Sequence, residues 1–349
     1  MKAAVFIEPG RFDVVEIPDP ACGPRDVVVQ VALCGICGSD LHSYLEGAFV
    51  EPGQVMGHEF SGTVVEVGAE VSGVSNGDRV TAVPILACGR CPRCLDGSTH
   101  LCETGLSASI AYGLPGAFAE YVRVPDVVVG GNLHLIPDSV DDVAAAMVEP
   151  LSVALHAVQS ALPGPADIVV VIGLGSIGLN IVQMAKTMGA GRVIGVDISP
   201  IRLDLASRIG ADYIIDSSGR SALEAVVELT GVGAYGVGAR ADVVFEASGV
   251  PALLADAISM TRSGGRLRIA ALYAGPVEID ANQIVQKELD VAGTFAYRGE
   301  FSQVLALLQS GRIQTESLVT DTFPLSGIND AFRSQLDKAK SIKVQVSPR

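Results

Sequence analysis

The sequence predicts an α/β protein with two domains, one irregular and mostly antiparallel β, the other a doubly wound parallel sheet. Three observations carry this prediction. The length of 349 residues suits two domains better than one. Short β-branched segments separated by Gly and Pro fill residues 1 to about 150. From about Asp141 onward, strand-like and helix-like segments alternate, which is typical of a parallel sheet with crossover helices.

The first domain is predicted from strand-forming segments that are bounded by turn residues. Strands are expected at Met1–Ile7, Val27–Val31 and Gly62–Gly68. An Ala-rich stretch with helical spacing follows at Val143–His156. The end of the chain adds an amphipathic helix and a last strand, at Phe301–Gln309 and Ile342–Val346.

The second domain is predicted from its alternating pattern. Strands are expected at Ile168–Ile172, Val193–Val196, Val243–Phe245 and Leu267–Ala271, and helices at Ile177–Met188, Arg202–Ile209 and Leu253–Met260. Strands joined by helices pair in parallel, because a crossover is long enough to return the chain to the same edge. The predicted domains are residues 1–152 with 295–349, and residues 153–294.

Composition excludes several classes of partner. The formal net charge is −15 and no basic run offsets it, so nucleic acid is not an expected partner. The N-terminus lacks the apolar run of a secretory signal, and apolar runs such as Ile168–Leu174 are far shorter than the roughly 20 residues that span a bilayer. We therefore expect a cytoplasmic protein without membrane contact.

Four of the seven cysteines have metal-ligand spacing. Cys88, Cys91, Cys94 and Cys102 form a C-x2-C-x2-C-x7-C pattern in a polar segment without apolar periodicity, which argues against core cysteines. Four thiolates complete a tetrahedral shell with no open position, which indicates a structural zinc. An iron–sulfur cluster uses the same ligands and stays as an alternative. Reduced thiols also fit the odd number of cysteines better than disulfides do.

The run Gly173-Leu174-Gly175-Ser176-Ile177-Gly178 has the context of a dinucleotide-binding turn. A predicted strand precedes it, a predicted helix follows, and Asp197 ends the next strand. The glycines let the backbone and the helix N-terminus approach a pyrophosphate. We therefore expect a Rossmann domain that binds NAD, with Ser248 lining the nicotinamide side. Arg202 covers the adenine, pairs with Asp204, or compensates a 2′-phosphate.

A second, dispersed set of ligand types consists of Cys37, His58, Glu59 and Glu149. One Cys, one His and one carboxylate leave a fourth zinc position open for water or an alcohol. Each residue alone is a weak signal, because a single His is more often a core or surface residue. Sequence spacing does not show that the four converge.

Four segments resemble the zinc-containing medium-chain dehydrogenases, namely Gly35–His42, Gly57–Gly62, the Cys88–Cys102 cluster and Glu149–Ser152. The resemblance covers almost the whole chain and is closest to the polyol, butanediol and threonine dehydrogenase branch; liver-type alcohol dehydrogenases have a Cys in place of Glu149. It implies a GroES-like catalytic domain beside the Rossmann domain. It also implies Cys37, His58 and Glu149 as ligands of a catalytic zinc, with Glu59 close to the metal or exchanging with a ligand.

The resemblance further implies hydride transfer between a secondary alcohol and NAD, with two zinc ions per chain. Ser39 would receive the hydroxyl proton, His42 would pass it on, and Asp40 would orient His58. Small vicinal diols or acyloins lead as substrates, polyols come next, and threonine-like compounds third. A zinc-free reductase and a non-enzymatic zinc- and nucleotide-binding sensor are the rival interpretations, and both leave the set of Cys37, Ser39, His58 and Glu149 unexplained.

Two features bear on the substrate. Tyr44 is expected to present its hydroxyl to an otherwise apolar pocket. Phe295-Ala296-Tyr297 stands where sorbitol-type enzymes carry Phe-Arg-Tyr, which weakens the case for long polyols. Arg298 either binds a substrate carboxylate or pairs with Glu300 at the surface.

The resemblance implies a homotetramer or, failing that, a homodimer. The candidate edge strands for such an assembly are Leu267–Ala271 and Val291–Phe295, which are equally explained as ordinary core.

Asp197 should select NAD over NADP. A carboxylate accepts hydrogen bonds from a 2′-hydroxyl but repels a 2′-phosphate, and one charge pair near 4 Å is worth about 4 kcal/mol at an effective dielectric of 20. Changing Asp197→Ala should relax the preference, measured as kcat/KM with NAD against NADP. Comparable efficiency with NADP in the unmodified protein would contradict this role.

Overall fold

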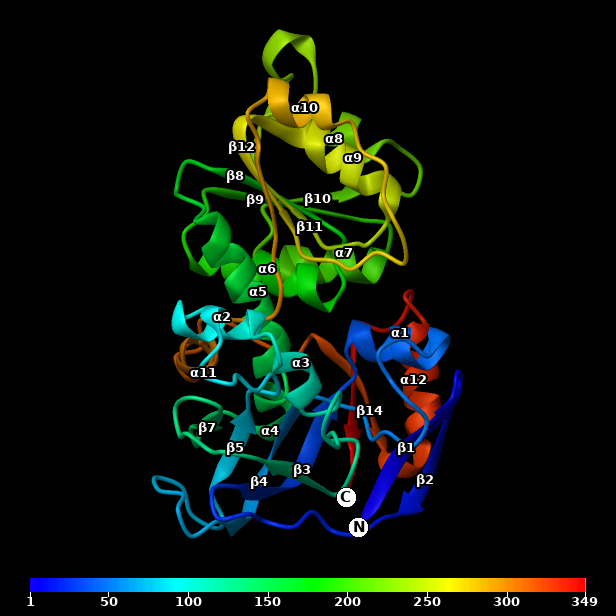
Figure 1. Ribbon diagram of the computed structural model, residues 1–349. Helices are drawn as coiled ribbons and strands as arrows, with labels where there is room; N and C mark the ends of the chain where they lie inside the picture. The colour runs from blue at the N-terminus through cyan, green and yellow to red at the C-terminus, as the bar shows by residue number, and fades with distance from the viewer. Residues whose placement is uncertain (349) are drawn as a thin grey trace. The chain divides into compact units, whose positions relative to one another are not determined.

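The computed structural model describes residues 1–348 and divides into two compact units. Unit 1 comprises Met1–Ser152 and the C-terminal segment from Tyr297, and unit 2 comprises Val153–Ala296 (Figure 1). The boundaries expected from the sequence are 152/153 and 294/295. No helix of the described residues is long and apolar enough to cross a membrane.

Unit 1 is built on a seven-stranded sheet and a separate hairpin. Its path is β14-β15-β3-β4-β5-β7, with β6 paired to β3, and only β14 and β15 run parallel. The strands are β1 Lys2–Glu8, β2 Arg11–Glu16, β3 Val27–Gly35, β4 Glu59–Val67, β5 Arg79–Ala82, β6 Tyr121–Val124, β7 Leu133–Leu135, β14 Val319–Pro324 and β15 Lys343–Ser347. This is the irregular, mostly antiparallel domain that the sequence predicts.

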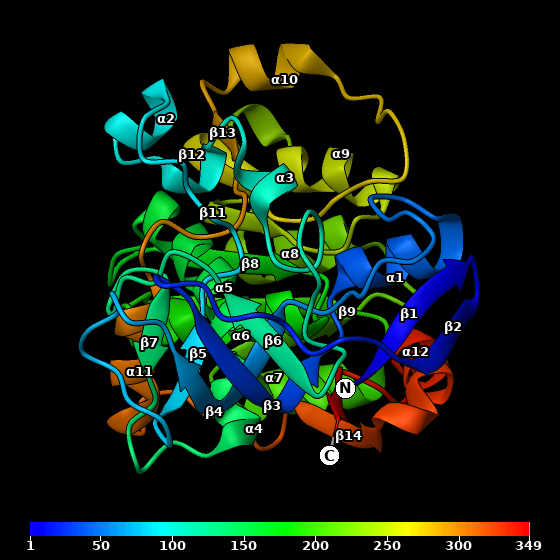
Figure 2. The same ribbon diagram turned by 60° about the horizontal axis from the view of Figure 1, so that its bottom comes forward.

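Short helices surround this sheet. They are α1 Gly38–Glu46, α2 Pro92–Leu95, α3 Gly105–Ala108, α4 Asp142–Ala145, α5 Val148–Ala161, α11 Phe301–Gln309 and α12 Ile328–Leu336, with short 3-10 turns η1 Thr99–Leu101 and η3 Leu325–Gly327. Helix α5 starts in unit 1 and ends in unit 2. Helix α12 lies against β2 and α1 (Figure 2), where the ring of Phe332 packs against Phe12 and Tyr44 in the core of the unit.

Unit 2 is a six-stranded parallel sheet in the order β10-β9-β8-β11-β12-β13. Its strands are β8 Ile168–Ile172, β9 Arg192–Asp197, β10 Tyr213–Asp216, β11 Ala241–Glu246, β12 Thr261–Ile269 and β13 Asp290–Gly293. Its helices are α6 Ser176–Thr187, α7 Pro200–Arg208, α8 Ala222–Thr230, α9 Pro251–Met260 and α10 Ala281–Gln286, with a 3-10 turn η2 at Ala234–Gly236. Helices cover both faces of the sheet (Figure 1), so the predicted doubly wound fold class is confirmed.

Several predicted elements need correction. The helix expected at Val143–His156 is two helices, α4 and α5. The strand expected at Leu267–Ala271 is β12, which lies between β11 and β13 and is therefore no edge strand. Strand β13 takes that edge. The sequence pattern does not predict strand β10 or helices α1, α8, α10 and α12; β10 has only four residues, Tyr-Ile-Ile-Asp, and is too short to be distinguished as a strand.

Close backbone packing fixes the turn between β8 and α6. Gly173 has φ +85°, and a Cβ there would lie 2.6 Å from the Cα of Ser248. A Cβ on Gly178 would lie 1.8 Å from the carbonyl oxygen of Gly173. In contrast, a Cβ on Gly175 would meet nothing within 4 Å. Two of the three glycines are therefore required by packing, and the third borders open space.

This contrast gives a stability prediction. Gly178→Ala forces a methyl group into a backbone carbonyl and should lower the free energy of unfolding by about 2 kcal/mol or more. Gly175→Ala is the matched control, and as an N-cap change it should cost less than about 1 kcal/mol. Urea unfolding of both variants measures the difference. An equal loss in the free energy of unfolding of the two variants would show that the close packing at Gly178 does not exclude a methyl group.

Candidate active site

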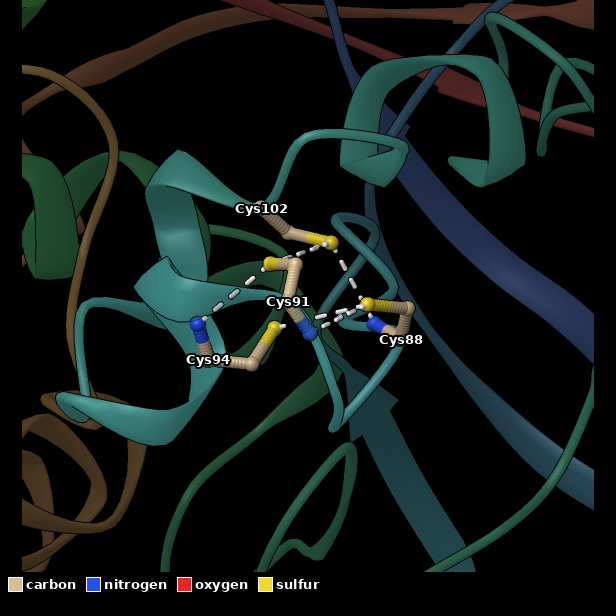
Figure 3. A group of neighbouring side chains, drawn as sticks. All are labelled: Cys88, Cys91, Cys94 and Cys102. Carbon is tan, nitrogen blue, oxygen red and sulfur yellow. Dashed lines mark hydrogen bonds between the residues drawn. The ribbon is translucent and has the colours of Figure 1, made fainter.

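The four predicted metal-binding cysteines lie together in unit 1 (Figure 3). Their sulfur atoms lie within 4.8 Å of one another, and both the Cys88–Cys94 and Cys91–Cys102 pairs are 3.9 Å apart. A zinc–sulfur bond of about 2.3 Å requires a tetrahedral edge of about 3.8 Å, so the spacing fits zinc. The loop and the start of α2 produce this arrangement, with Cys91 as the N-cap.

Backbone N–H groups favour thiolates in this cluster. The N–H of Cys88 donates to the sulfur of Cys102 at 3.3 Å, and the N–H of Cys94 donates to Cys91 at 3.4 Å. The Cys88 bond is the main reason that the pKa of Cys102 falls to about 6. Burial, in contrast, raises the pKa of Cys94 to about 12, so the thiolate is not favoured at all four cysteines. Zinc binds the thiolate form.

A second group joins Cys37, His58 and Glu59, whose ligand atoms also lie within 4.8 Å of one another. Cys37 is the N-cap of α1, and His58 and Glu59 stand at the start of β4. Nδ1 of His58 is buried without a hydrogen-bond partner among residues 1–348 and lies 3.7 Å from Asp40 Oδ1. Asp40 is itself fixed by the N–H of Cys37 at 2.9 Å, so it is placed to orient His58.

Glu59 forms a buried ion pair as well as belonging to this group. Nζ of Lys343 lies 2.6 and 2.8 Å from the two carboxylate oxygens and donates to the carbonyl of Ile36 at 3.0 Å. Glu59 is 1% exposed and Lys343 is 3% exposed. A Cβ on Gly35 would meet Glu59 Oε2 at 2.2 Å, so glycine is needed there. The pair holds the Glu59 carboxylate beside Cys37 and His58.

Glu149 lies outside the group of three, in the first turn of α5. Burial raises its pKa to about 7. The hydroxyl of Tyr297 is also buried and has no hydrogen-bond partner of ordinary geometry within residues 1–348. Burial and then the charge of Glu149 raise the pKa of Tyr297, which shows that the two side chains are neighbours. Glu59 thus belongs to the group with Cys37 and His58, whereas Glu149, whose pKa is also affected by the charge of His58, lies outside that group.

Ser39 is held by a residue that the sequence analysis missed. Tyr112 donates a hydrogen bond from its hydroxyl to Oγ of Ser39 at 2.8 Å, and its ring centroid lies 5.6 Å from that of His58. Burial raises the pKa of Tyr112 to about 12. No motif marks Tyr112 in the sequence. His42 lies on α1 with Nδ1 3.6 Å from Glu46, and its side chain is 33% exposed.

Two expected substrate contacts are wrong in this structure. Tyr44 is 4% exposed and packs with its ring centroid 5.6 Å from Phe12 and 4.8 Å from Phe332, so it is a core residue. Arg298 donates to the carbonyl oxygens of Gly97 at 2.8 Å and Asp96 at 3.0 Å. Its guanidinium group is therefore already engaged and is not free to bind a substrate carboxylate. The expected ion pair with Glu300 is also absent among the described residues, because the Glu300 carboxylate accepts the backbone N–H of Arg298.

The predicted dinucleotide residues gather at the carboxyl ends of the unit 2 strands. Asp197 accepts N–H bonds from Leu174 at 2.6 Å, Ile198 at 2.7 Å and Ser199 at 2.9 Å, which fix its carboxylate beside the glycine turn. Oγ of Ser176, at the start of α6, is buried without a partner in the described part of the chain.

The glycine turn fits a dinucleotide. Gly175 borders open space and Ser176 opens helix α6, with Ile177 and Gly178 in its first turn. A helix N-terminus beside a gap suits a pyrophosphate. Arg202 lies in α7, and the hydroxyl of Ser248 is engaged in its own turn.

A chain with a dinucleotide turn, a closed four-cysteine centre and an open Cys-His-Glu centre has the parts of a zinc- and dinucleotide-dependent oxidoreductase. Residues 23–137 match the alcohol dehydrogenase GroES-like domain, and residues 176–310 match the zinc-binding dehydrogenase family. The chain belongs to the zinc-containing medium-chain alcohol dehydrogenase family.

Individual relatives are similar over nearly all of their length. Sorbitol dehydrogenase of Bacillus subtilis is 35% identical, over 100% of this chain and 97% of the relative. L-threonine 3-dehydrogenase of Bacillus licheniformis is 37% identical, over 93% of this chain and 92% of the relative. The crystal structure of 2R,3R-butanediol dehydrogenase from Bacillus subtilis has a TM-score of 0.89 at 35% identity, covering 100% of this chain and 99% of that chain.

One further solved structure is that of an alcohol dehydrogenase of Escherichia coli CFT073 complexed with NADH. It has a TM-score of 0.90 at 31% identity and covers 99% of both chains. The polyol, butanediol and threonine dehydrogenase branch that the sequence resembles is thus represented among its relatives.

Mutations should distinguish the roles of the two metal centres. We expect two zinc ions per chain. Cys91→Ser should lower stability, because the closed site loses a ligand, whereas Cys37→Ser should abolish turnover in a folded protein. Glu59→Gln and Glu149→Gln form a matched pair: the geometry predicts that only Glu59→Gln drops to about one zinc per chain.

Metal analysis with thermal unfolding as the folding control measures these outcomes. One zinc in the unmodified protein, or normal turnover of Cys37→Ser, would refute the two-site interpretation. Loss of zinc only in Glu149→Gln would restore Glu149 as the third ligand.

Proposed function

We propose that the protein transfers a hydride between NAD and a small secondary alcohol that carries a neighbouring polar group. Vicinal diols and acyloins lead, polyols follow, and threonine-like compounds come third. The observation that carries this proposal is the Cys37, His58 and Glu59 group, with two further buried polar side chains, Glu149 and Tyr297, in the same unit. An alcohol with a second hydroxyl or carbonyl group could form hydrogen bonds with both Glu149 and Tyr297.

Cys37, His58 and one carboxylate would hold the catalytic zinc, and Cys88, Cys91, Cys94 and Cys102 the structural zinc. Bound there, zinc supplies a Lewis acid that lowers the pKa of an alcohol. The protein supplies the proton path. Ser39, whose Oγ accepts a hydrogen bond from Tyr112 at 2.8 Å, would take the hydroxyl proton. His42, which lies 3.6 Å from Glu46 and is partly exposed, would pass it to solvent.

NAD is favoured over NADP by the surroundings of Asp197. Three backbone N–H groups hold its carboxylate at the end of β9, so a negative charge is fixed where the fold places the ribose. The glycine turn beside it supports binding of the pyrophosphate at the start of α6.

Threonine ranks third because Arg298 is engaged by Asp96 and Gly97 and offers no carboxylate site. The 37% identity to a threonine dehydrogenase keeps threonine among the candidate substrates.

Assembly as a homotetramer or homodimer and a cytoplasmic location also stay proposals. Strand β13 leaves one edge of the unit 2 sheet without a partner strand among the described residues. Val285 and Leu272, in the segments around it, are 76% and 57% exposed. Exposed apolar side chains beside an open sheet edge favour association with a second copy.

The substrate ranking is tested by kcat/KM on 2,3-butanediol, sorbitol and threonine with NAD. We expect the highest value for butanediol, a lower one for sorbitol and the lowest for threonine. Arg298→Ala is the control: because its guanidinium holds backbone carbonyls, the variant should lose stability, about 1–2 kcal/mol, without a selective loss on threonine. A threonine preference that collapses in Arg298→Ala would overturn the ranking, and a preference for ethanol would reject the polar-neighbour requirement.

A further inference from the structure

Glu246 is a buried carboxylate at the edge of unit 2 where a dinucleotide binds in this fold. It is the last residue of β11 and is 0% exposed. Its neighbours in the sheet are Ile172, which ends β8, and Ile269, which ends β12. Because β8 and β11 are adjacent while their crossovers run to opposite sides, this is the switch point of the sheet.

The Glu246 carboxylate is held by hydrogen-bond donors and by no cation. Oε1 accepts the N–H of Ser248 at 2.8 Å and also the Ser248 hydroxyl, while Oε2 accepts the Tyr273 hydroxyl at 2.5 Å. Within residues 1–348, no Lys, Arg or His forms an ion pair with it. All three donors are neutral groups. Burial and the Glu246 carboxylate raise the pKa of Tyr273, so the phenol keeps the proton it donates.

Three loops meet tightly around this carboxylate. A Cβ on Gly173 would lie 2.6 Å from Ser248, and a Cβ on Gly249 would lie 2.8 Å from the carbonyl oxygen of Leu272. The Ser248 hydroxyl also accepts the N–H of Val250 at 3.1 Å, so both of its roles are taken within the turn. The turns after β8, β11 and β12 are thus locked together, and Glu246 is the charge that they enclose.

The fold divides a dinucleotide between the two sides of the switch point. Asp197 ends β9 on one side and marks the adenosine half, so the nicotinamide half belongs to the side of β11 and β12. NAD⁺ and NADH differ in charge by one unit, and that unit is on the nicotinamide ring. A fixed negative charge on this side therefore interacts differently with the two forms.

We propose that Glu246, held by Ser248 and Tyr273, is a positioning residue that favours the oxidised, positively charged nicotinamide over the reduced ring. This inference rests on the proposed NAD-linked function. It assigns Glu246 an electrostatic role through space, and it assigns Tyr273 a share in holding the carboxylate in place. Neither residue is expected to touch the alcohol.

The test is the dissociation constants of NAD⁺, NADH and ADP-ribose on the zinc-loaded protein, measured by calorimetry without substrate. Glu246→Gln keeps the size of the side chain and removes the charge. The ratio Kd(NAD⁺)/Kd(NADH) should rise on the order of tenfold. ADP-ribose lacks nicotinamide, so its Kd should stay within about twofold of the unmodified protein.

Two variants of Tyr273 complete the design. Tyr273→Phe removes a hydrogen bond but leaves the charge, so its ratio should change less than about threefold. Tyr273→Lys places an ammonium group beside Glu246 and should raise the ratio as Glu246→Gln does. If Glu246→Gln does not fold, the Kd ratio of Tyr273→Lys tests the proposal instead.

The outcomes separate this inference from the proposed function. An unchanged ratio in Glu246→Gln or Tyr273→Lys, with ADP-ribose still bound, overturns the role of Glu246. Equal losses for all three ligands also overturn it, because the residue would then be structural. If the unmodified protein binds neither NADH nor ADP-ribose, it is the NAD-linked function that fails.

Discussion

The buried ion pair between Lys343 and Glu59 is the interaction on which the metal-binding unit depends. Lys343 belongs to β15 near the end of the chain, whereas Glu59 and Ile36 belong to its first segments. The same contact thus completes the sheet, where β15 lies between β14 and β3, and positions a carboxylate next to Cys37 and His58. Removing either partner would leave an uncompensated buried charge, which typically costs about 3–5 kcal/mol. The sheet and the metal centre are therefore stabilised together.

The two units use buried carboxylates in opposite ways. In unit 1, Glu59 is neutralised by an ammonium group at hydrogen-bond distance. In unit 2, Glu246 is surrounded by neutral donors, and its charge remains available to a ligand. Paired charge fixes structure, while a hydrogen-bonded but unpaired charge creates a field at the carboxyl ends of the strands.

The four-cysteine lobe is connected to the chain that returns from unit 2. Arg298 donates to the carbonyls of Asp96 and Gly97, two and three residues after Cys94, and its neighbour Tyr297 lies close to Glu149. These hydrogen bonds join the cysteine lobe to the segment that carries Tyr297, although the two metal-binding groups share no ligand.

Features confined to one short segment could be predicted from the sequence. The cysteine cluster, the glycine turn with Asp197 and the alternating strands of unit 2 are local patterns, and the structure has them where the residues indicate. They can be predicted because the spacing of residues along a loop or a strand already determines how their side chains are arranged.

Contacts between side chains that are distant in the sequence were decided only by the tertiary structure. It placed Glu59 rather than Glu149 with Cys37 and His58, and it brought Tyr112 to Ser39. It also buried Tyr44 against Phe332, and engaged Arg298 with the backbone of the cysteine lobe. Each outcome joins side chains that no local spacing relates, because sheet order and helix packing, set by burial of the whole core, determine which of them meet.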